Sequence, residues 1–273
     1  MCWLYPAADV IFGAATGLSE PNPGRRSQFP LSLGTPPSRE YDMIRLSIIV
    51  PAYNEEATVI VLLERVNAQS VDGVSFEVIV VDDGSSDRTV ALLEARPELY
   101  ATLIKRPVNG GKGAAVTGAL RAATGDYVLF QDADLEYDPA DYAALLRPVL
   151  DYDADVVIGS RFLGPSCTRV AYFWNKLGNL LITLFFNVLN NTTFSDIYSC
   201  YLLYRRSLID PERLVATGWD QHAEILSRAV AGGSRFYDVA INYFGRTVEE
   251  GKKIRAHHIF AVLWTILVRR LSR

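Results

Sequence analysis

From residue 46 onward, short apolar runs alternate with amphipathic segments. The first run, residues 46–50 (LSIIV), is continuous and rich in β-branched side chains, which is typical of a strand buried on both faces of a parallel sheet. The segment that follows, 55–68, places its apolar residues at helical spacing. The pattern predicts strands at 46–50, 76–81, 101–105, 127–130 and 155–158, and helices at 55–68, 87–95, 113–123 and 139–150.

This alternation predicts an α/β fold with a doubly wound, mostly parallel sheet. The connections are short, so helices should cover both faces of the sheet. In such sheets ligands bind beyond the carboxyl ends of the strands. The composition, 49% hydrophobic and 21% charged, is that of a globular protein, and the net charge of −4 argues against a nucleic-acid partner. The three cysteines, Cys2, Cys167 and Cys200, share no metal-ligand spacing and indicate thiols in a reducing compartment.

The first 43 residues differ from the rest of the chain. They contain six prolines and show no sustained helical or strand period. We expect residues 1–43 to be a disordered extension without chemistry, followed by one domain over 44–255. Two origins of the extension stay open: a natural disordered tail, or a start assigned upstream of a true start at Met43.

Residues 256–273 form a basic and apolar C-terminal segment. Its apolar run, 259–268, is shorter than the roughly 20 residues needed to cross a bilayer, as is a second run at 180–189. Cations flank the run at 259–268, and no Asp or Glu occurs from 251 onward. The pattern predicts an amphipathic helix at the membrane–water interface. The alternative is a helix docked on the core of the domain.

Four consecutive strand-to-helix loops carry carboxylates, glycines or a lysine. They are 51–55 (PAYNE), 82–85 (DDGS), 109–113 (NGGKG) and 131–136 (QDADLE). The third is not a phosphate-binding loop of the nucleoside-triphosphatase type, because no Ser or Thr follows Lys112. All four loops should meet at one edge of the sheet.

The fourth loop predicts a metal site. Asp132 and Asp134 are two residues apart, so an extended chain directs both side chains to one face, and Glu136 continues the series. Three hard oxygen donors suit Mg²⁺ or Mn²⁺, which would also take the oxygens of a diphosphate and act as a Lewis acid. We therefore expect these three residues to be the metal ligands, with Asp134 a catalytic residue.

Together and in this order, the four loops resemble the family 2 glycosyltransferases, which have the A-type nucleotide-sugar fold. Within that family the chain is most similar to the branch of dolichol-phosphate mannosyltransferases and polyprenol-phosphate glucosyltransferases. The resemblance covers about residues 46–254. It implies an inverting hexosyltransferase with a UDP- or GDP-hexose donor. The residues that it assigns to the donor are Pro51, Tyr53, Glu55, Asp83, Lys112 and Asp132.

The resemblance also bears on the acceptor. Residues 159–162 (GSRF) are similar to a motif of this branch in which an arginine contacts phosphate, which makes Arg161 a catalytic candidate. Transfer to a phosphate needs cations rather than a base, because the nucleophile is already an anion. Arg161, Arg169 and Lys176 precede the apolar run at 180–189 and are candidates to hold that phosphate.

We therefore expect transfer to a polyprenyl phosphate by an enzyme that is peripheral at the cytoplasmic face of a membrane. Transfer to a hydroxyl of a saccharide or secondary metabolite stays open as the alternative. The chain departs from the family pattern at Tyr198 and His222, where acidic residues are usual, and at His257-His258. These departures bear on the identity of the sugar and the acceptor. A nucleotidyltransferase and a non-catalytic scaffold are weaker rivals.

Overall fold

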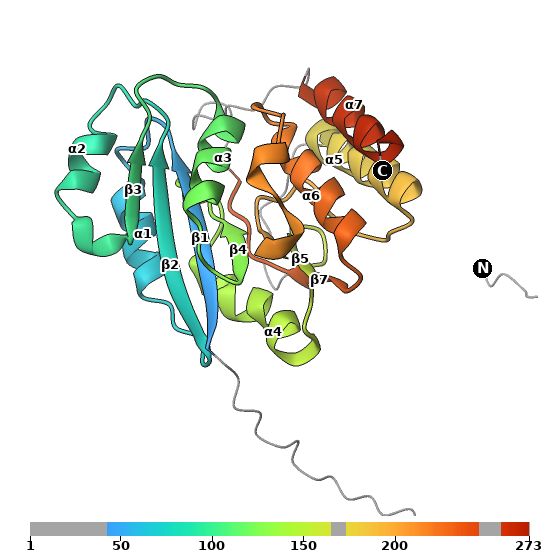
Figure 1. The fold of residues 1–273 in the computed structure, drawn as a ribbon, viewed down its shortest axis with the longest axis horizontal. Coiled ribbons are helices and arrows are strands. Elements are labelled where there is room, and N and C mark those ends of the chain that lie inside the picture. The colour runs from blue at the N-terminus through green and yellow to red at the C-terminus, as the bar shows by residue number, and fades with distance from the viewer. Residues whose placement is uncertain (1–42, 165–172, 246–257, 273) are drawn as a thin grey trace, which may run out of the picture. The chain divides into compact units, whose positions relative to one another are not determined.

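The computed structural model describes residues 43–164, 173–245 and 258–272, so nearly all of the predicted extension 1–43 lies outside the described residues. The described strands form one sheet in the order β3-β2-β1-β4-β6-β5-β7 (Figure 1). Their bounds are Ile44–Ala52 for β1, Val74–Asp82 for β2, Thr102–Lys105 for β3, Tyr127–Phe130 for β4, Val156–Ser160 for β5, Leu202–Arg205 for β6 and Phe236–Ala240 for β7. The predicted α/β fold with a mostly parallel sheet is confirmed.

The first half of the sheet is parallel throughout. Strand β1 lies between β2 and β4, so that Ile48 stands opposite Val78 on one side and Leu129 on the other. All three side chains are buried. Full burial of a side chain of this size contributes about 1.5–3 kcal/mol. A central strand that is apolar on both faces is therefore strongly fixed in place, and with it the loops at its carboxyl end.

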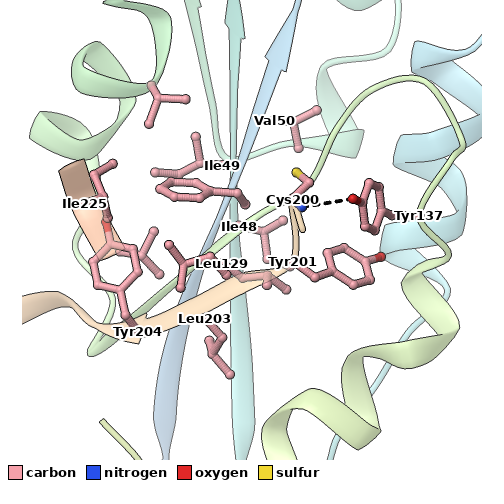
Figure 2. Close-up of a cluster of buried hydrophobic side chains, with 14 of the residues drawn as sticks. Ile48, Ile49, Val50, Leu129, Tyr137, Cys200, Tyr201, Leu203, Tyr204 and Ile225 are labelled. Atoms are coloured by element: carbon pink, nitrogen blue, oxygen red, sulfur yellow. Dashed lines mark hydrogen bonds between the residues drawn. The ribbon is translucent and has the colours of Figure 1, made fainter. Parts of the chain in front are cut away.

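The second half contains two strands that the sequence pattern did not reveal. Strand β6 is antiparallel to both β4 and β5 and lies between them, while β7 continues the sheet parallel to β5. Figure 2 shows Tyr201 and Tyr204, both fully buried, at this junction. The hydroxyl of Tyr201 donates to Oε1 of Gln131 at 2.7 Å, which ties the start of β6 to the end of β4.

The helices are α1 Val59–Asn67, α2 Thr89–Glu94, α3 Lys112–Ala122, α4 Tyr142–Tyr152, α5 Phe173–Asn190, α6 Gln221–Gly232 and α7 His258–Leu271. Of the four helices predicted between 55 and 150, α1, α2 and α4 begin later than expected and α3 begins one residue earlier. Helix α1 starts four residues after the predicted Glu55, because the residues before it form a loop with a contact to Thr89. Asn54 has a left-handed φ of 52°, and the backbone N–H of Glu55 donates to Oγ1 of Thr89 at 2.9 Å.

Helices α5 and α7 lie side by side, and α7 also packs on α6 (Figure 1). Val262 and Ile266 of α7 are buried, whereas Phe260 and Trp264 are 73% and 67% exposed. The helix thus has a docked apolar face and an exposed apolar face rather than one apolar and one polar face. None of the helices in the described part of the chain combines the length and the apolar character that crossing a membrane requires.

Candidate functional site

A cleft of about 620 Å³ opens at the carboxyl ends of β1, β2, β4 and β5. Most of the residues proposed from the sequence line it. They are Pro51, Tyr53, Glu55, Asp83, Lys112, Asp132, Asp134, Glu136 and Arg161. Lys176, on α5, is not a lining residue of the cleft as the described residues define it; its Nζ lies 5.6 Å from the centroid of the Phe162 ring. Arg169 lies outside the described residues.

Asp83 connects the glycine-containing loop 109–113 to the end of β2 through hydrogen bonds. Its Oδ1 accepts from the backbone N–H of Gly110 at 3.1 Å and its Oδ2 from that of Gly111 at 2.9 Å. It also forms an ion pair with Arg106 and is 3% exposed. Gly111 has a φ of 89°, a conformation that other residues rarely adopt. The loop therefore presents Lys112, the first residue of α3, in a fixed position.

Lys112 and Asp132 form an ion pair within the cleft, which joins the third loop to the fourth. Burial opposes charge on both groups, but each stabilises the charge of the other, so the pKa of Lys112 is raised and that of Asp132 is lowered. Nζ of Lys112 also lies 5.7 Å from the ring centroid of Trp219 and 3.9 Å from Sγ of Cys200. The backbone N–H of Cys200 donates to the hydroxyl of Tyr137, as Figure 2 shows.

The acidic loop does not have the extended geometry assumed for it. Leu135 has a φ of 63°, so the chain turns between Asp134 and Glu136, and the prediction that Glu136 continues the alternation of an extended chain was wrong. Glu136 is buried and accepts from the hydroxyl of Tyr243. Among the described residues, no group of three or more His, Cys, Asp or Glu side chains is placed to hold a metal ion.

Two carboxylates of that loop, Asp132 and Asp134, nevertheless line the cleft together. Mg²⁺ is commonly held by one or two carboxylates, with the remaining positions taken by water and substrate phosphates. The donor set therefore fits a divalent cation that binds together with a diphosphate. It does not form a cage of protein ligands.

Arg161 follows β5 and is held by Asp196. Its Nε donates to Oδ2 at 2.7 Å and its Nη2 to Oδ1 at 2.8 Å, and its guanidinium lies 5.2 Å from the ring centroid of Tyr243. Asp196 is fully buried and the Arg161 side chain is 12% exposed. The sequence pattern assigned Asp196 no role. Its position before the strand β6, which was not predicted, explains why.

The remaining wall of the cleft comes from α5, α6 and α7. Its members include Asn175, Gly178, Asn179 and Ile182 of α5, His222 of α6, and Ile259 and Val262 of α7. Burial, with a further contribution from the charge of Lys112, lowers the pKa of His222 to about 4. The imidazole is therefore neutral at pH 7. It lies between the rings of Phe130 and Tyr198, with centroids 6.4 and 6.0 Å away.

Comparison with known proteins identifies the family. The family model described as "Glycosyl transferase family 2" matches residues 47–211, which is more than half of the chain. The chain belongs to glycosyl transferase family 2. The four loops that line the cleft lie within the matched region, and the resemblance noted in the sequence is confirmed.

Two curated members of family 2 are similar over most of the chain. The undecaprenyl-phosphate 4-deoxy-4-formamido-L-arabinose transferase of Pseudomonas aeruginosa is 33% identical over 180 residues, which cover 63% of this chain and 50% of that protein. The low-salt glycan biosynthesis hexosyltransferase Agl6 of Haloferax volcanii is 30% identical over 208 residues, which cover 75% and 49%. The chain spans about half the length of these relatives.

Solved structures confirm the A-type glycosyltransferase fold. Glucosyl-3-phosphoglycerate synthase from Mycobacterium tuberculosis, in complex with Mn²⁺, uridine diphosphate and phosphoglyceric acid, gives a TM-score of 0.62 at 23% identity, over 83% of this chain and 78% of that one. TarS 1–349 of S. aureus, in complex with UDP-GlcNAc, gives 0.57 at 20% identity, over 83% and 66%. At these identities the likeness concerns the fold alone.

Proposed function

We propose that this protein transfers a hexose, with inversion, from a nucleotide-diphosphate sugar to a polyprenyl phosphate at a membrane surface. The observation that carries the proposal is the distribution of charge in one cleft. The carboxylates Asp132 and Asp134 come from the loop after β4, and the cation Arg161 from the loop after β5. The first pair suits a metal-bound diphosphate, and the arginine suits a second phosphate.

The donor would lie over the first four loops. Pro51, Tyr53, Glu55 and Asp83 would contact the base and ribose, and Lys112 would lie near the phosphates or the sugar. Asp132 and Asp134 would hold Mg²⁺ or Mn²⁺, with Glu136 as a more distant member because Tyr243 holds its carboxylate. The bound metal would supply Lewis-acid stabilisation of the leaving diphosphate. The Mn²⁺ and uridine diphosphate named in the mycobacterial synthase complex support this arrangement.

The acceptor phosphate would meet Arg161. A guanidinium has five N–H donors, and two of those of Arg161 reach the Asp196 carboxylate. The ion pair orients the group, and the other donors are directed away from that carboxylate. Lys176 would assist from α5, and Arg169 would assist from outside the described residues. Because a phosphate monoester is already an anion near pH 7, the chain needs no residue to deprotonate it.

The surface beside the cleft supports the proposal that the acceptor is a lipid. Helices α5 and α7 expose large apolar side chains that a water-soluble acceptor would not require. These are Phe173, Trp174, Leu180, Leu181, Leu184 and Val188 of α5, and Phe260, Trp264 and Leu271 of α7. Apolar patches of this kind mark interaction sites with membranes or proteins. The relative named as an undecaprenyl-phosphate transferase favours a membrane, and we place the protein on its cytoplasmic face.

The test is a matrix of donors and acceptors with the purified chain and Mn²⁺. Donors are UDP- and GDP-hexoses, and acceptors are undecaprenyl phosphate, undecaprenol and water-soluble saccharides. We expect labelled hexose to enter the lipid extract only with the phosphorylated lipid, and EDTA to stop the transfer. Transfer to undecaprenol or to a soluble saccharide, with none to the lipid phosphate, would overturn the proposal in favour of a hydroxyl acceptor.

A further inference from the structure

Helix α5 separates the cleft from the exposed apolar surface. Asn175, Gly178, Asn179 and Ile182 have the spacing i, i+3, i+4, i+7 and form the face that lines the cleft. The opposite face carries exposed leucines, such as Leu184, which is 59% exposed. A lipid whose phosphate lies in the cleft can therefore reach the apolar surface along the cleft-lining face of α5.

Trp174 marks where that path ends. It lines the cleft and is also 76% exposed, so it belongs to the cleft and to the apolar surface at once. It lies one turn before Gly178 on α5. An apolar chain that runs from the middle of the α5 face to this tryptophan stays in contact with protein up to the point where it reaches the surface.

Gly178 leaves open space at the middle of this face. Among the described residues, no atom would lie within 4 Å of a Cβ added there, and the φ of Gly178 is not in the left-handed region, so a larger side chain would enter the cleft without backbone strain. Lys176 lies two residues earlier on α5, on the opposite side of the helix, and does not line the cleft as the described residues define it. Arg161 and Gly178 line the same cleft, so a phosphate at Arg161 and an apolar chain at Gly178 would occupy one continuous space.

We infer that the cleft wall at Gly178 is the seat of the first isoprene units of the acceptor, which then leave the cleft past Trp174. The inference rests on the proposed function and adds a determinant of chain recognition to it. A branched five-carbon unit needs the width that the absence of a side chain at 178 provides, and contact with Ile182 would favour an apolar over a polar chain.

Gly178→Leu tests this directly, and α3 offers a matched control. Gly118 is also inside a helix, and in the described part of the chain a Cβ there meets nothing within 4 Å and the residue does not line the cleft. For Gly178→Leu we expect the KM for long-chain polyprenyl phosphate to rise at least tenfold. The affinity for nucleoside diphosphate with Mn²⁺, measured by calorimetry, should stay within twofold. Gly118→Leu should change neither quantity.

Gly178→Ala supplies a graded second variant. It adds a single methyl group, so the KM should rise by less than for leucine, and both variants should melt at or above the wild-type temperature because glycine is a poor helix former. An unchanged KM in both Gly178 variants overturns the inference and leaves the proposed function standing. A loss of affinity for the nucleoside diphosphate that equals the rise in the KM for the lipid also overturns the inference, because the donor and not the acceptor would then contact the cleft wall at Gly178. If the wild-type protein uses no prenyl phosphate, the proposed function itself fails.

Discussion

Arg161 and Asp196 form a bidentate ion pair at the edge of the cleft, in which Asp196 also accepts from the backbone N–H of Arg161 at 3.1 Å. Three hydrogen bonds to one carboxylate fix both the loop after β5 and the plane of the guanidinium. Since Asp196 is fully buried, these hydrogen bonds replace the water contacts that its carboxylate would otherwise make. The pair therefore sets the orientation in which Arg161 can meet a phosphate.

Asp196→Asn should weaken acceptor binding more than donor binding. The amide keeps the shape of the side chain but loses the charge that orients the guanidinium, so we expect the KM for polyprenyl phosphate to rise about tenfold, equivalent to about 1.4 kcal/mol. The donor KM should stay within twofold. Asp210→Asn is the control, because Asp210 forms an ion pair with Arg213 on the exposed surface, and it should change neither value. Equal rises in both KM values would show a general loss of structure instead.

Asp134→Asn should lower transfer by about 10²–10³-fold, the usual cost of removing one electrostatic contact to the transition state. The rate is measured across a Mn²⁺ titration, since a weakened metal site shifts the concentration required. Asp138→Asn removes the same charge four residues later. Asp138 accepts from the N–H of Ala140 and does not line the cleft, so this variant should remain active. Near wild-type turnover of Asp134→Asn with an unchanged Mn²⁺ requirement would contradict the metal assignment.

The contacts of Glu77, which does not line the cleft as the described residues define it, predict that the stability of the fold depends on pH. Burial alone would raise its pKa, but hydrogen bonds from Ser47 and Thr124 and the charge of Arg45 outweigh it, and the pKa is lowered from 4.5. The unfolded chain therefore takes up a proton at this group before the folded one does. The stabilisation is present above pH 4.5 and is lost as the pH falls through the lower folded value.

Glu77→Gln should accordingly lower the free energy of unfolding by about 2 kcal/mol at pH 7, because hydrogen bonds to a charged group are lost. The difference from wild type should narrow below pH 4.5. Urea titrations at several pH values measure it. Glu64→Gln removes an exposed partner of Arg96 and should cost less than about 0.5 kcal/mol at every pH. If the difference in unfolding free energy between Glu77→Gln and wild type stays constant with pH, the charge of Glu77 is not the cause of the destabilisation.

Phe260→Ser together with Trp264→Ser should weaken binding to vesicles of anionic phospholipid. Each side chain is more than two-thirds exposed, so the fold should be retained, and burial of each in lipid would contribute about 1.5–3 kcal/mol. We expect the partition constant from co-sedimentation to fall at least tenfold. Val215→Ser, at a 67% exposed apolar residue outside α5 and α7, is the control. Undiminished sedimentation of the double variant would argue that α7 does not contact the membrane.

Deletion of the whole C-terminal helix is a poorer experiment than these substitutions. Val262 and Ile266 are part of the core, and Ile259 and Val262 line the cleft. The apolar sequence of α7 could not distinguish a docked helix from an interfacial one, because both of its faces are apolar. The structure shows a docked face beside an exposed one. The predicted contact with the membrane therefore concerns only the exposed face of α7.

The parallel half of the fold was predictable because each strand there has its own pattern of apolar residues. Strand β6, LLYR, was not, since it becomes a strand through antiparallel pairing with two neighbours, which the pattern of apolar residues does not show. The positions of the site loops followed from the strand ends. Their internal geometry did not follow, because nothing in the identity of Leu135 indicates its left-handed φ of 63°. A glycine or an asparagine at position 135 would have indicated a left-handed conformation.

The place of β6 has a consequence for synthesis of the chain. Strands β4 and β5 follow one another along the chain, yet the strand that joins them in the sheet comes after α5. A nascent chain that has been made as far as Ser160 therefore holds β4 and β5 with facing edges that have no strand between them. Open edges are templates for pairing with other chains. These edges stay open to such pairing until Arg205 has been made, and only then can β6 join the two halves of the sheet.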